Sequence, residues 1–163
     1  MLVNSAIVLA TVLVMEAVAF AVHKYVMHGP GWGWHRSHHV GHEHVFEAND
    51  LYAVVFAAAS IGLVLFSRVS SPLYWVGAGM GVYGLLYFIV HDGLVHQRWP
   101  FRHVPRNGYL KRLVQAHRLH HAVEAREGGV SFGFLYAPPV RRLKEQLRGR
   151  AALHEPGHEK ADR

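Results

Sequence analysis

Three long apolar stretches constrain the fold of this chain more than any other feature of its sequence. They cover residues 1–22, 51–67 and 72–90, and the only charged side chain within them is that of Glu16. A helix crosses the hydrocarbon core of a bilayer with about 17–25 residues, so each stretch is long enough for one span. A soluble bundle would interleave charged and apolar residues instead. We therefore predict an all-α fold, an integral-membrane helical bundle with about three to four spans.

The basic residues predict how this bundle is oriented. If the N-terminus lies outside the cell, only Arg68 in the turn RVSSP is external, and the other 16 of the 17 Lys and Arg residues are cytoplasmic. This distribution follows the positive-inside rule. We therefore expect a multi-pass protein of the inner (cytoplasmic) membrane, with its active site on the cytoplasmic side. Residues 1–140 are predicted to form the membrane domain, and residues 141–163 a charged C-terminal tail that is partly disordered.

Four histidine motifs follow the predicted spans and repeat one order twice. They are HKYVMH at 23–28, HRSHH at 35–39, HDGLVH at 91–96 and HRLHH at 117–121. Residues three and four apart on an α-helix share a face, so the three imidazoles of each His-x-x-His-His triad can converge. We expect each triad to be completed by the looser pair ahead of it. On this topology all four motifs lie at one membrane face, as a histidine-rich helical cap.

The His-x4-His pairs fit a regular helix less well than the triads do. Five residues advance about 140° beyond one full turn, so the two rings of each pair diverge on an ideal α-helix. Two explanations remain open. A π-bulge would bring the rings together, and Gly93 would make such a distortion easier in the second pair. Alternatively, the two rings of a pair serve different metal ions.

Ten convergent imidazoles are too many for one metal ion and suit two. The chain has no cysteine, which excludes thiolate sites, and zinc sites usually take three or four protein ligands. About five ligands for each ion favour a metal of larger coordination number with room for oxygen, and we predict two iron ions. Zinc binds the same ligands and can replace iron in recombinant protein. The predicted metal ligands are His23, His28, His35, His38, His39, His91, His96, His117, His120 and His121.

Six further residues are candidates for orienting the ligand imidazoles. They are Glu16, His42, His44, Asp50, Asp92 and His103. An acid inside a span is a functional candidate, so Glu16 either hydrogen-bonds a ligand ring or is protonated and bonded to a neighbouring helix. The two aspartates could orient ring N–H groups or could have surface or capping roles. No catalytic residue beyond the metal ligands is predicted, since the histidines have no acid–base partner pattern.

The segments around the second half of the motifs have their own predicted structure. Residues 97–108 contain two prolines and are expected to form a loop. Tyr109–Glu127 has helical apolar spacing, which places the triad HRLHH on a helix. Residues 128–140 are apolar but rich in Gly and Pro, so they are expected to form a loop or an interfacial hairpin. Gly77, Gly81 and Gly84 recur along the third span, which favours close helix packing over a groove for a polyene.

The order and spacing of the histidine motifs resemble those of the fatty acid hydroxylase superfamily of integral-membrane di-iron enzymes. The flanking stretches HGPGWGWHRSHH, FEANDLYAVVFA and GGVSFGFLYAPP resemble those of its bacterial β-carotene hydroxylases. The resemblance extends from about Glu16 to Val140. One departure from the wider superfamily is HDGLVH, which has four intervening residues where fatty acid and sterol members often have three.

The resemblance implies a non-haem di-iron monooxygenase of carotenoid biosynthesis. It would insert one oxygen atom from O2 at C3 of a β-ionone ring, converting β-carotene through β-cryptoxanthin to zeaxanthin. Its electrons would come from an external donor, a reduced ferredoxin or a similar carrier. The ten motif histidines match the metal ligands of the family residue by residue. A site at the ends of the spans could meet a substrate dissolved in the lipid bilayer.

Other functions compete with this one. The same chemistry could act on a fatty acyl or sterol lipid, or the outcome could be that of a ketolase or a desaturase. A membrane metal transport or storage protein is a different class, but transporters hold their ligands near the bilayer midplane, whereas these histidines follow the ends of the spans. No nucleic-acid partner is expected, because the basic residues line a membrane.

Overall fold

The computed structural model of the protein describes residues 1–40, 46–100 and 102–154, and all regular structure in these ranges is helical. The all-α prediction is therefore confirmed. The elements in chain order are α1 (Leu2–Ala21), η1 (Val22–Met27), α2 (Trp32–His39), α3 (Asp50–Phe66), α4 (Pro72–Tyr87), η2 (Phe88–Val95), α5 (Gly108–His121) and α6 (Val140–His154). Two of them, η1 and η2, are π-helices that directly continue α1 and α4.

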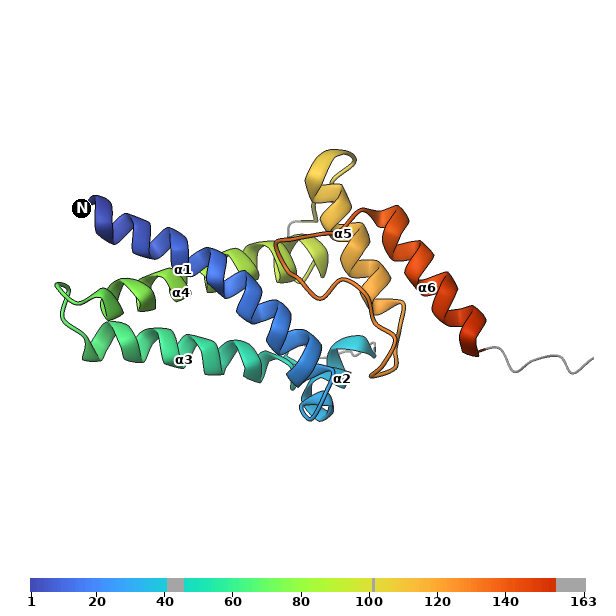
Figure 1. Ribbon diagram of the computed structural model, residues 1–163, viewed down its shortest axis with the longest axis horizontal. Helices are drawn as coiled ribbons and strands as arrows, with labels where there is room; N and C mark the ends of the chain where they lie inside the picture. The colour runs from blue at the N-terminus through green and yellow to red at the C-terminus, as the bar shows by residue number, and fades with distance from the viewer. Residues whose placement is uncertain (41–45, 101, 155–163) are drawn as a thin grey trace, which may run out of the picture.

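The helices α1, α3 and α4 lie side by side and form what we call the apolar half of the molecule (Figure 1). Helix α4 packs against both of the others, because two glycines let it approach closely. A Cβ atom on Gly77 would lie 2.8 Å from Cβ of Leu63 in α3, and one on Gly79 would lie 2.6 Å from Cβ of Thr11 in α1. Small residues at such positions are typical of helix packing within membranes.

The apolar half has the dimensions and the surface of a membrane bundle. The continuous helices Leu2–Met27 and Pro72–Val95 are each long and apolar enough to cross a membrane, and α3 is a shorter apolar helix. Large apolar side chains on its outer face are exposed, among them Leu13 (75%) and Leu65 (71%). Lipid would cover such a surface, and water would not. These helices confirm the predicted class of an integral-membrane helical bundle.

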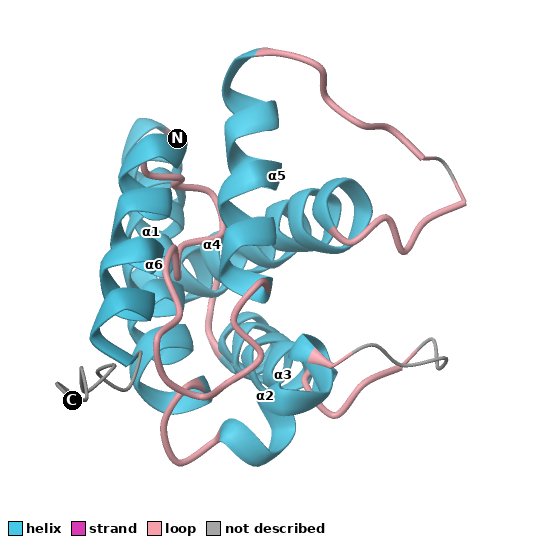
Figure 2. Cartoon of the chain, turned by 90° about the vertical axis from the view of Figure 1, so that its right-hand side faces the viewer, coloured by secondary structure: helices cyan, strands magenta, loops and turns pink. Residues whose placement is uncertain are grey.

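The other end of the molecule, which we call the histidine half, consists of α2, α5, the two π-helices and the loop at 122–139. Figure 2 views the molecule from this end, with α5 in the upper part of the picture and α2 in the lower part. Helix α6 packs against α5 through Leu143, which is 1% exposed and contacts Leu113 and Ala116. The segment expected to be a charged tail therefore begins as a helix. Residues 155–163 lie outside the described residues.

Two helix boundaries differ from the expected ones. Helix α5 ends at His121 rather than at Glu127, because the carbonyl groups that follow it are used by imidazoles. A continuing helix would have consumed these carbonyl groups in its own hydrogen bonds. The glycine-rich stretch GPGWGW at 29–34 predicts a turn, but helix α2 begins inside it, at Trp32. The predicted loops at 97–108 and 128–140 are observed in their described residues up to 107 and 139, where α5 and α6 begin.

Candidate metal centre

The two π-helices bring the His-x4-His pairs together. The backbone N–H of His28 donates to the carbonyl of His23 at 3.0 Å, and that of His96 to the carbonyl of His91 at 2.9 Å. Both bonds span five residues, which defines a π-turn. The ring centroids are 5.3 Å apart in the first pair and 4.5 Å in the second. The π-bulge explanation is therefore confirmed for both pairs.

Gly93 contributes to the second π-helix in a way that the sequence analysis did not anticipate. A Cβ atom at this position would lie 2.9 Å from two atoms of the Trp99 indole ring. The missing side chain therefore allows Trp99 to lie directly across η2. The same indole ring also packs against Phe88, with centroids 5.2 Å apart. Gly93 is needed here for a close approach rather than only for an unusual backbone conformation.

The histidines converge in two clusters, and each cluster takes residues from both repeats. Within each cluster the ligand nitrogens lie within 4.8 Å of one another. His91 adjoins the second cluster, since its Nε2 atom lies 3.2 Å from Nε2 of His38. The first cluster contains His23, His28, His35, His39 and His120, and the second contains His38, His96, His117 and His121.

This division differs from the expected one, in which each triad stays together. His38 leaves the first triad for the second cluster, and His120 leaves the second triad for the first cluster. The reason is helical geometry. The first and last histidines of a His-x-x-His-His triad are about 40° apart around the helix, while the middle one lies about 100° from the last. The middle imidazole of each triad therefore faces across to the opposite cluster.

The first cluster is oriented mainly by backbone carbonyl groups of the loop at 122–139. Because a carbonyl oxygen can only accept, the Nδ1 atom facing it carries the proton and Nε2 keeps its lone pair. His35 is held instead by the Asn49 side chain, with 2.7 Å between Nδ1 and Oδ1. The four rings that donate from Nδ1 to the loop are His23 (Phe132, 2.9 Å), His28 (Arg126, 2.7 Å), His39 (Val123, 2.9 Å) and His120 (Val130, 2.8 Å).

The second cluster is oriented partly by carboxylates. His38 Nδ1 lies 3.1 Å from Oε2 of Glu47, and His91 Nδ1 lies 2.8 Å from Oδ1 of Asp92. Asp92 therefore takes the ring-orienting position proposed for it from the sequence. Glu47 was not predicted. Both contacts again assign the proton to Nδ1, so the Nε2 atoms face the interior of the cluster with free lone pairs.

The inward-facing nitrogens need a cation between them. The Nε2 atoms of His23 and His35 are 3.0 Å apart, and those of His96 and His117 are 2.9 Å apart. In the first of these pairs both Nδ1 atoms carry the proton, so two lone pairs face each other and repel unless a positive charge lies between them. Metal–nitrogen bonds of about 2.1 Å meeting at right angles place neighbouring nitrogens about 3.0 Å apart, whereas tetrahedral ligands would be about 3.4 Å apart. The residues present therefore fit a metal ion of high coordination number in each cluster.

Burial keeps these imidazoles in the neutral form that binds metal. It lowers the pKa of His35 to about 3 and that of His39 to about 4. The pKa of His121 falls to about 2, first through burial and then through the neighbouring imidazoles. The same two causes hold the pKa of His117 and His120 well below the usual value. A neutral imidazole is a metal ligand and a protonated one is not.

Glu16 bonds to a loop rather than to an imidazole. Its Oε1 atom accepts the backbone N–H groups of Phe134 and Tyr136 at 3.0 and 2.9 Å, and Tyr83 in α4 donates its hydroxyl to Oε2 at 2.8 Å. Gly133 lies so close that an added Cβ would be 2.8 Å from Oε1. Glu16 therefore fixes the segment whose Phe132 carbonyl orients His23, and it reaches the metal centre only through this loop.

The remaining candidates lie away from the imidazoles or beyond the described residues. Asp50 pairs with Arg98 and accepts the backbone N–H of Glu47 at 3.0 Å, so it supports the carboxylates rather than a ring. His103 is exposed on the loop before α5 and belongs to neither cluster. His42 and His44 lie outside the described residues.

Some residues of the centre were missed by the sequence analysis. The side chains of Glu47 and Asn49 hold ring nitrogens, and Arg98 pairs with the acids around them. A signal for the first two exists, because FEAND follows directly after the histidine-rich stretch that starts at HRSHH. The loop carbonyls have no such signal, since every residue carries one.

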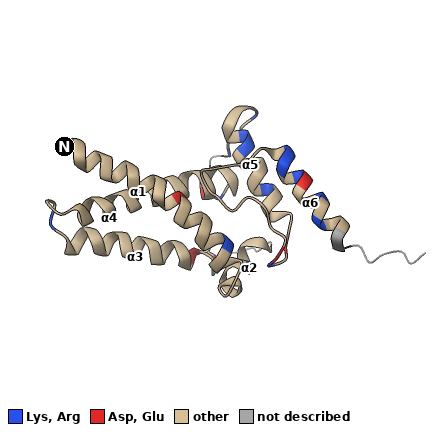
Figure 3. Ribbon diagram, in the orientation of Figure 1, with Lys and Arg blue, Asp and Glu red and all other residues tan. Residues whose placement is uncertain are grey.

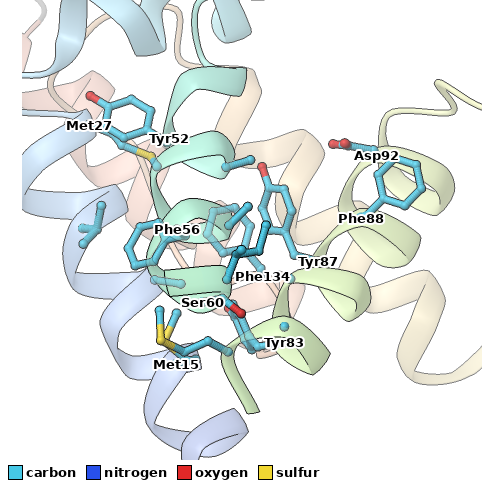
Figure 4. Close-up of a pocket in the computed structure, with 18 residues that line it drawn as sticks. Met15, Met27, Tyr52, Phe56, Ser60, Tyr83, Tyr87, Phe88, Asp92 and Phe134 are labelled. Carbon is cyan, nitrogen blue, oxygen red and sulfur yellow. The ribbon is translucent and has the colours of Figure 1, made fainter. Parts of the chain in front are cut away.

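An apolar cavity of ≈ 340 Å³ lies between α1, α3 and α4 and extends to the histidine half (Figure 4). Two rings separate it from the clusters. Phe134 stacks on His23 with centroids 5.1 Å apart, and Tyr87 stacks on His91 at 4.4 Å. Gly84 lines this cavity, and an added Cβ there would meet nothing within 4 Å.

The three glycines of α4 therefore have two different roles. Gly77 allows helix packing, as the sequence analysis favoured. Gly81 and Gly84 line the cavity, which was the alternative. An added Cβ on Gly81 would meet only the Ser60 hydroxyl oxygen, at 3.3 Å.

The comparisons with known proteins agree with this site. The chain matches the fatty acid hydroxylase family over residues 8–138. It is 64% identical to a β-carotene hydroxylase of Pantoea ananas over 148 residues, which are 90% of this chain and 85% of the relative. A β-carotene hydroxylase of Paracoccus sp. (strain N81106 / MBIC 01143) is 57% identical over 159 residues, 96% of this chain and 98% of the relative.

More distant relatives are also named as β-carotene hydroxylases. The chloroplastic β-carotene 3-hydroxylase 1 of Arabidopsis thaliana is 39% identical over 129 residues, which are 76% of this chain and 41% of the relative. No solved structure matches the chain. The family match and the names of these relatives indicate a hydroxylating oxygenase, and the two buried histidine clusters fit metal binding. The chain belongs to the fatty acid hydroxylase family and, within it, groups with the bacterial β-carotene hydroxylases.

Proposed function

We propose that this protein is a di-iron β-carotene hydroxylase. It adds a hydroxyl group at C3 of each β-ionone ring and converts β-carotene through β-cryptoxanthin to zeaxanthin. The observation that carries the proposal is the pair of imidazole clusters, with their Nε2 lone pairs directed inward, next to an apolar cavity. The names of its relatives supply the substrate class.

The metal ions supply the oxidising chemistry and the chain supplies the arrangement around them. Two iron ions, with O2 and electrons from an external donor, would provide an oxidant for an unactivated C–H bond, which no side chain can provide. The first cluster would hold one ion, and the second cluster together with His91 would hold the other. The loop carbonyls, Asn49, Glu47 and Asp92 fix the rings. Phe134 and Tyr87 cover the inner face of the centre and exclude water there.

The cavity suits a hydrocarbon ring better than the polar end of a lipid. Three of the four hydroxyl groups in its lining already donate to protein oxygens, and the fourth belongs to Tyr87, which stacks on His91. These bonds run from Tyr52 to the Gly31 carbonyl at 3.0 Å, from Ser60 to the Gly77 carbonyl at 2.8 Å and from Tyr83 to Glu16 at 2.8 Å. A β-ionone ring of β-carotene has no group that needs a hydrogen bond, so it loses nothing on entering such a site. This favours a carotenoid over a fatty acyl or sterol substrate.

The charge distribution supports a cytoplasmic position for the centre. Lys and Arg side chains gather on α5 and α6 at the histidine end, while the opposite end has Arg68 in the turn between α3 and α4 (Figure 3). The proposed location is the inner membrane, with the apolar half crossing the bilayer and the histidine half in the cytoplasm. An acidic donor such as a reduced ferredoxin would be attracted to this basic end. In the proposed organisation, residues 1–140 are the hydroxylase domain and residues 141–163 its charged tail.

Expression of the chain in bacteria that accumulate β-carotene tests the function. Pigment extracts separated by liquid chromatography are expected to contain β-cryptoxanthin and zeaxanthin, which an empty vector does not produce. Ketone products would indicate a ketolase instead. An extract that holds only β-carotene, with the protein present in the membrane fraction, would contradict the proposal.

A further inference from the structure

The two histidine clusters differ in the charge of the groups behind their rings. Each of the five imidazoles in the first cluster donates its Nδ1 proton to a neutral oxygen, four to backbone carbonyls and His35 to the Asn49 amide. His38 of the second cluster and the adjoining His91 face the carboxylates of Glu47 and Asp92 instead. These two rings are neighbours, with 3.2 Å between their Nε2 atoms.

Arg98 joins the acids on this side of the centre. Its guanidinium forms a two-pronged pair with Asp50, at 3.0 and 2.9 Å. It also lies 3.6 Å from Oε1 of Glu47 and 3.8 Å from Oδ1 of Asp92. The backbone adds a further link, because the N–H of Arg98 donates to the carbonyl of Asp92 at 2.9 Å. One cation thus holds both ring-orienting carboxylates, which come from segments far apart in the sequence.

These contacts place carboxylate groups behind the second cluster, where the first cluster has neutral oxygens. Three carboxylates surround the single guanidinium of Arg98, and the Glu47 carboxylate is only 5% exposed. A carboxylate that accepts the N–H of an imidazole raises the basicity of that ring and strengthens its bond to a metal. A neutral carbonyl group raises the basicity of an imidazole less, because it carries no full charge.

We propose that Glu47 and Asp92, held in place by Arg98, make the two metal sites unequal. The second cluster binds its ion more tightly and favours its more highly charged state, and Arg98 acts as a positioning residue for that site alone. This inference rests on the proposed di-iron function. It assigns a role to Arg98 and Glu47, and it predicts two distinguishable ions rather than a symmetrical pair.

The substitutions Glu47→Gln and Asp92→Asn test the charge with little change of shape. An amide oxygen can still accept the ring N–H, so the imidazoles stay oriented while the negative charge is removed. The full-length protein is purified in detergent and loaded with 57Fe. Competition with a chelator is expected to show two irons in the wild type and, in each variant, a roughly 10–100-fold weaker affinity at one site only.

Arg98→Met tests the positioning role, with Arg141→Met as its matched control. Arg141 pairs with Glu145 on the surface of α6, where its side chain is 91% exposed. Arg98→Met is expected to weaken the same single site as Glu47→Gln, whereas the control retains both irons. If Arg98→Met fails to fold, as judged by circular dichroism, the two amide variants still decide the question.

Asn49→Asp supplies the reverse test, because it places a carboxylate behind His35 in the first cluster. Mössbauer spectra of the wild type are expected to show two quadrupole doublets. Glu47→Gln and Asp92→Asn should shift one doublet and Asn49→Asp the other. A single doublet for both irons, or equal weakening of both sites in the amide variants, would overturn this inference. A wild-type protein that cannot hold two irons would instead contradict the proposed function.

Discussion

The apolar half and the histidine half of this molecule are each stabilised by a different kind of interaction. In the apolar half, helices approach closely through glycines such as Gly77 and Gly79, and much of the outer surface is apolar and exposed. In the histidine half, buried rings are held by individual polar partners, as His35 is by Asn49. Packing of the first kind tolerates substitutions of similar volume. A buried polar group that loses its partner is costly, so the second kind tolerates few changes.

The two halves meet where α-helix changes to π-helix. Helix α1 continues as η1 and α4 continues as η2, and the first ligand of each His-x4-His pair lies in that π-segment. The cavity ends at the same level, beside Tyr87 and Phe134. The residues proposed to hold metal and those proposed to hold substrate therefore lie in different halves. Substitutions in each half should have different consequences.

The largest effects are expected for His38→Ala and His120→Ala. Each removes the one imidazole that its triad gives to the opposite cluster. Hydroxylation should fall below about one-hundredth of the wild-type level, with reduced iron content, because one ion loses a ligand. Pigment analysis and metal analysis check both results. His103→Ala, which changes an exposed histidine in neither cluster, is the control. Full hydroxylation in both cluster variants would show that the two-cluster centre is wrong.

A cavity variant should separate substrate binding from metal binding. Gly84→Leu places a side chain in the space between α1, α3 and α4, and we expect conversion of β-carotene to fall about 10-fold, since loss of a well-fitted position costs 10–100-fold. Iron content should stay unchanged. Gly62→Leu on α3 is matched, because an added Cβ is equally free there but Gly62 does not line the cavity. Equal loss in the two variants would argue against the cavity as the substrate site.

Glu16→Gln tests the polar link between the halves. The amide keeps one oxygen for the backbone N–H groups of Phe134 and Tyr136, but it lacks the negative charge that strengthens these bonds. Its NH2 group also replaces the oxygen that accepts the Tyr83 hydroxyl. We expect a loss of about 1–3 kcal/mol in stability and partial loss of activity through the displaced loop. Thermal unfolding in detergent measures the loss of stability. Tyr83→Phe removes a single hydrogen bond to the same carboxylate and should cost about 0.5–1.5 kcal/mol. A larger cost for Tyr83→Phe than for Glu16→Gln would contradict this role of Glu16.

The last prediction concerns mild acid, which should destabilise the metal-free protein. The folded pKa values of His35 and His39, about 3 and 4, lie below the value of about 6.5 expected in the unfolded chain. The unfolded state therefore takes up protons first, and stability falls as pH drops below about 6.5. Above about pH 7 these groups cause no pH dependence. Hydrogen exchange should show opening in the histidine half while α1 and α4 remain protected. Opening of α1 and α4 before the histidine half would contradict this prediction.

Much of the fold was predictable from the sequence, because it depends on local patterns. The apolar stretches became α1, α3 and α4, and the awkward spacing of His23 and His28 indicated a π-turn. The exchange of His38 and His120 between clusters was not predictable, since it depends on how two helices face each other in space. The carbonyl partners in the loop were also hidden, because a backbone group leaves no trace in the residue type.

The most direct test of the account is the origin of the oxygen atom in the product. Purified, iron-loaded protein in lipid vesicles containing β-carotene is given a chemical reductant and 18O2. We predict that each new hydroxyl group of β-cryptoxanthin and zeaxanthin carries one 18O atom, detected by mass spectrometry, and that His38→Ala gives no labelled product. Hydroxylated product whose oxygen comes from water, or no product from protein that holds two irons, would contradict the central claim.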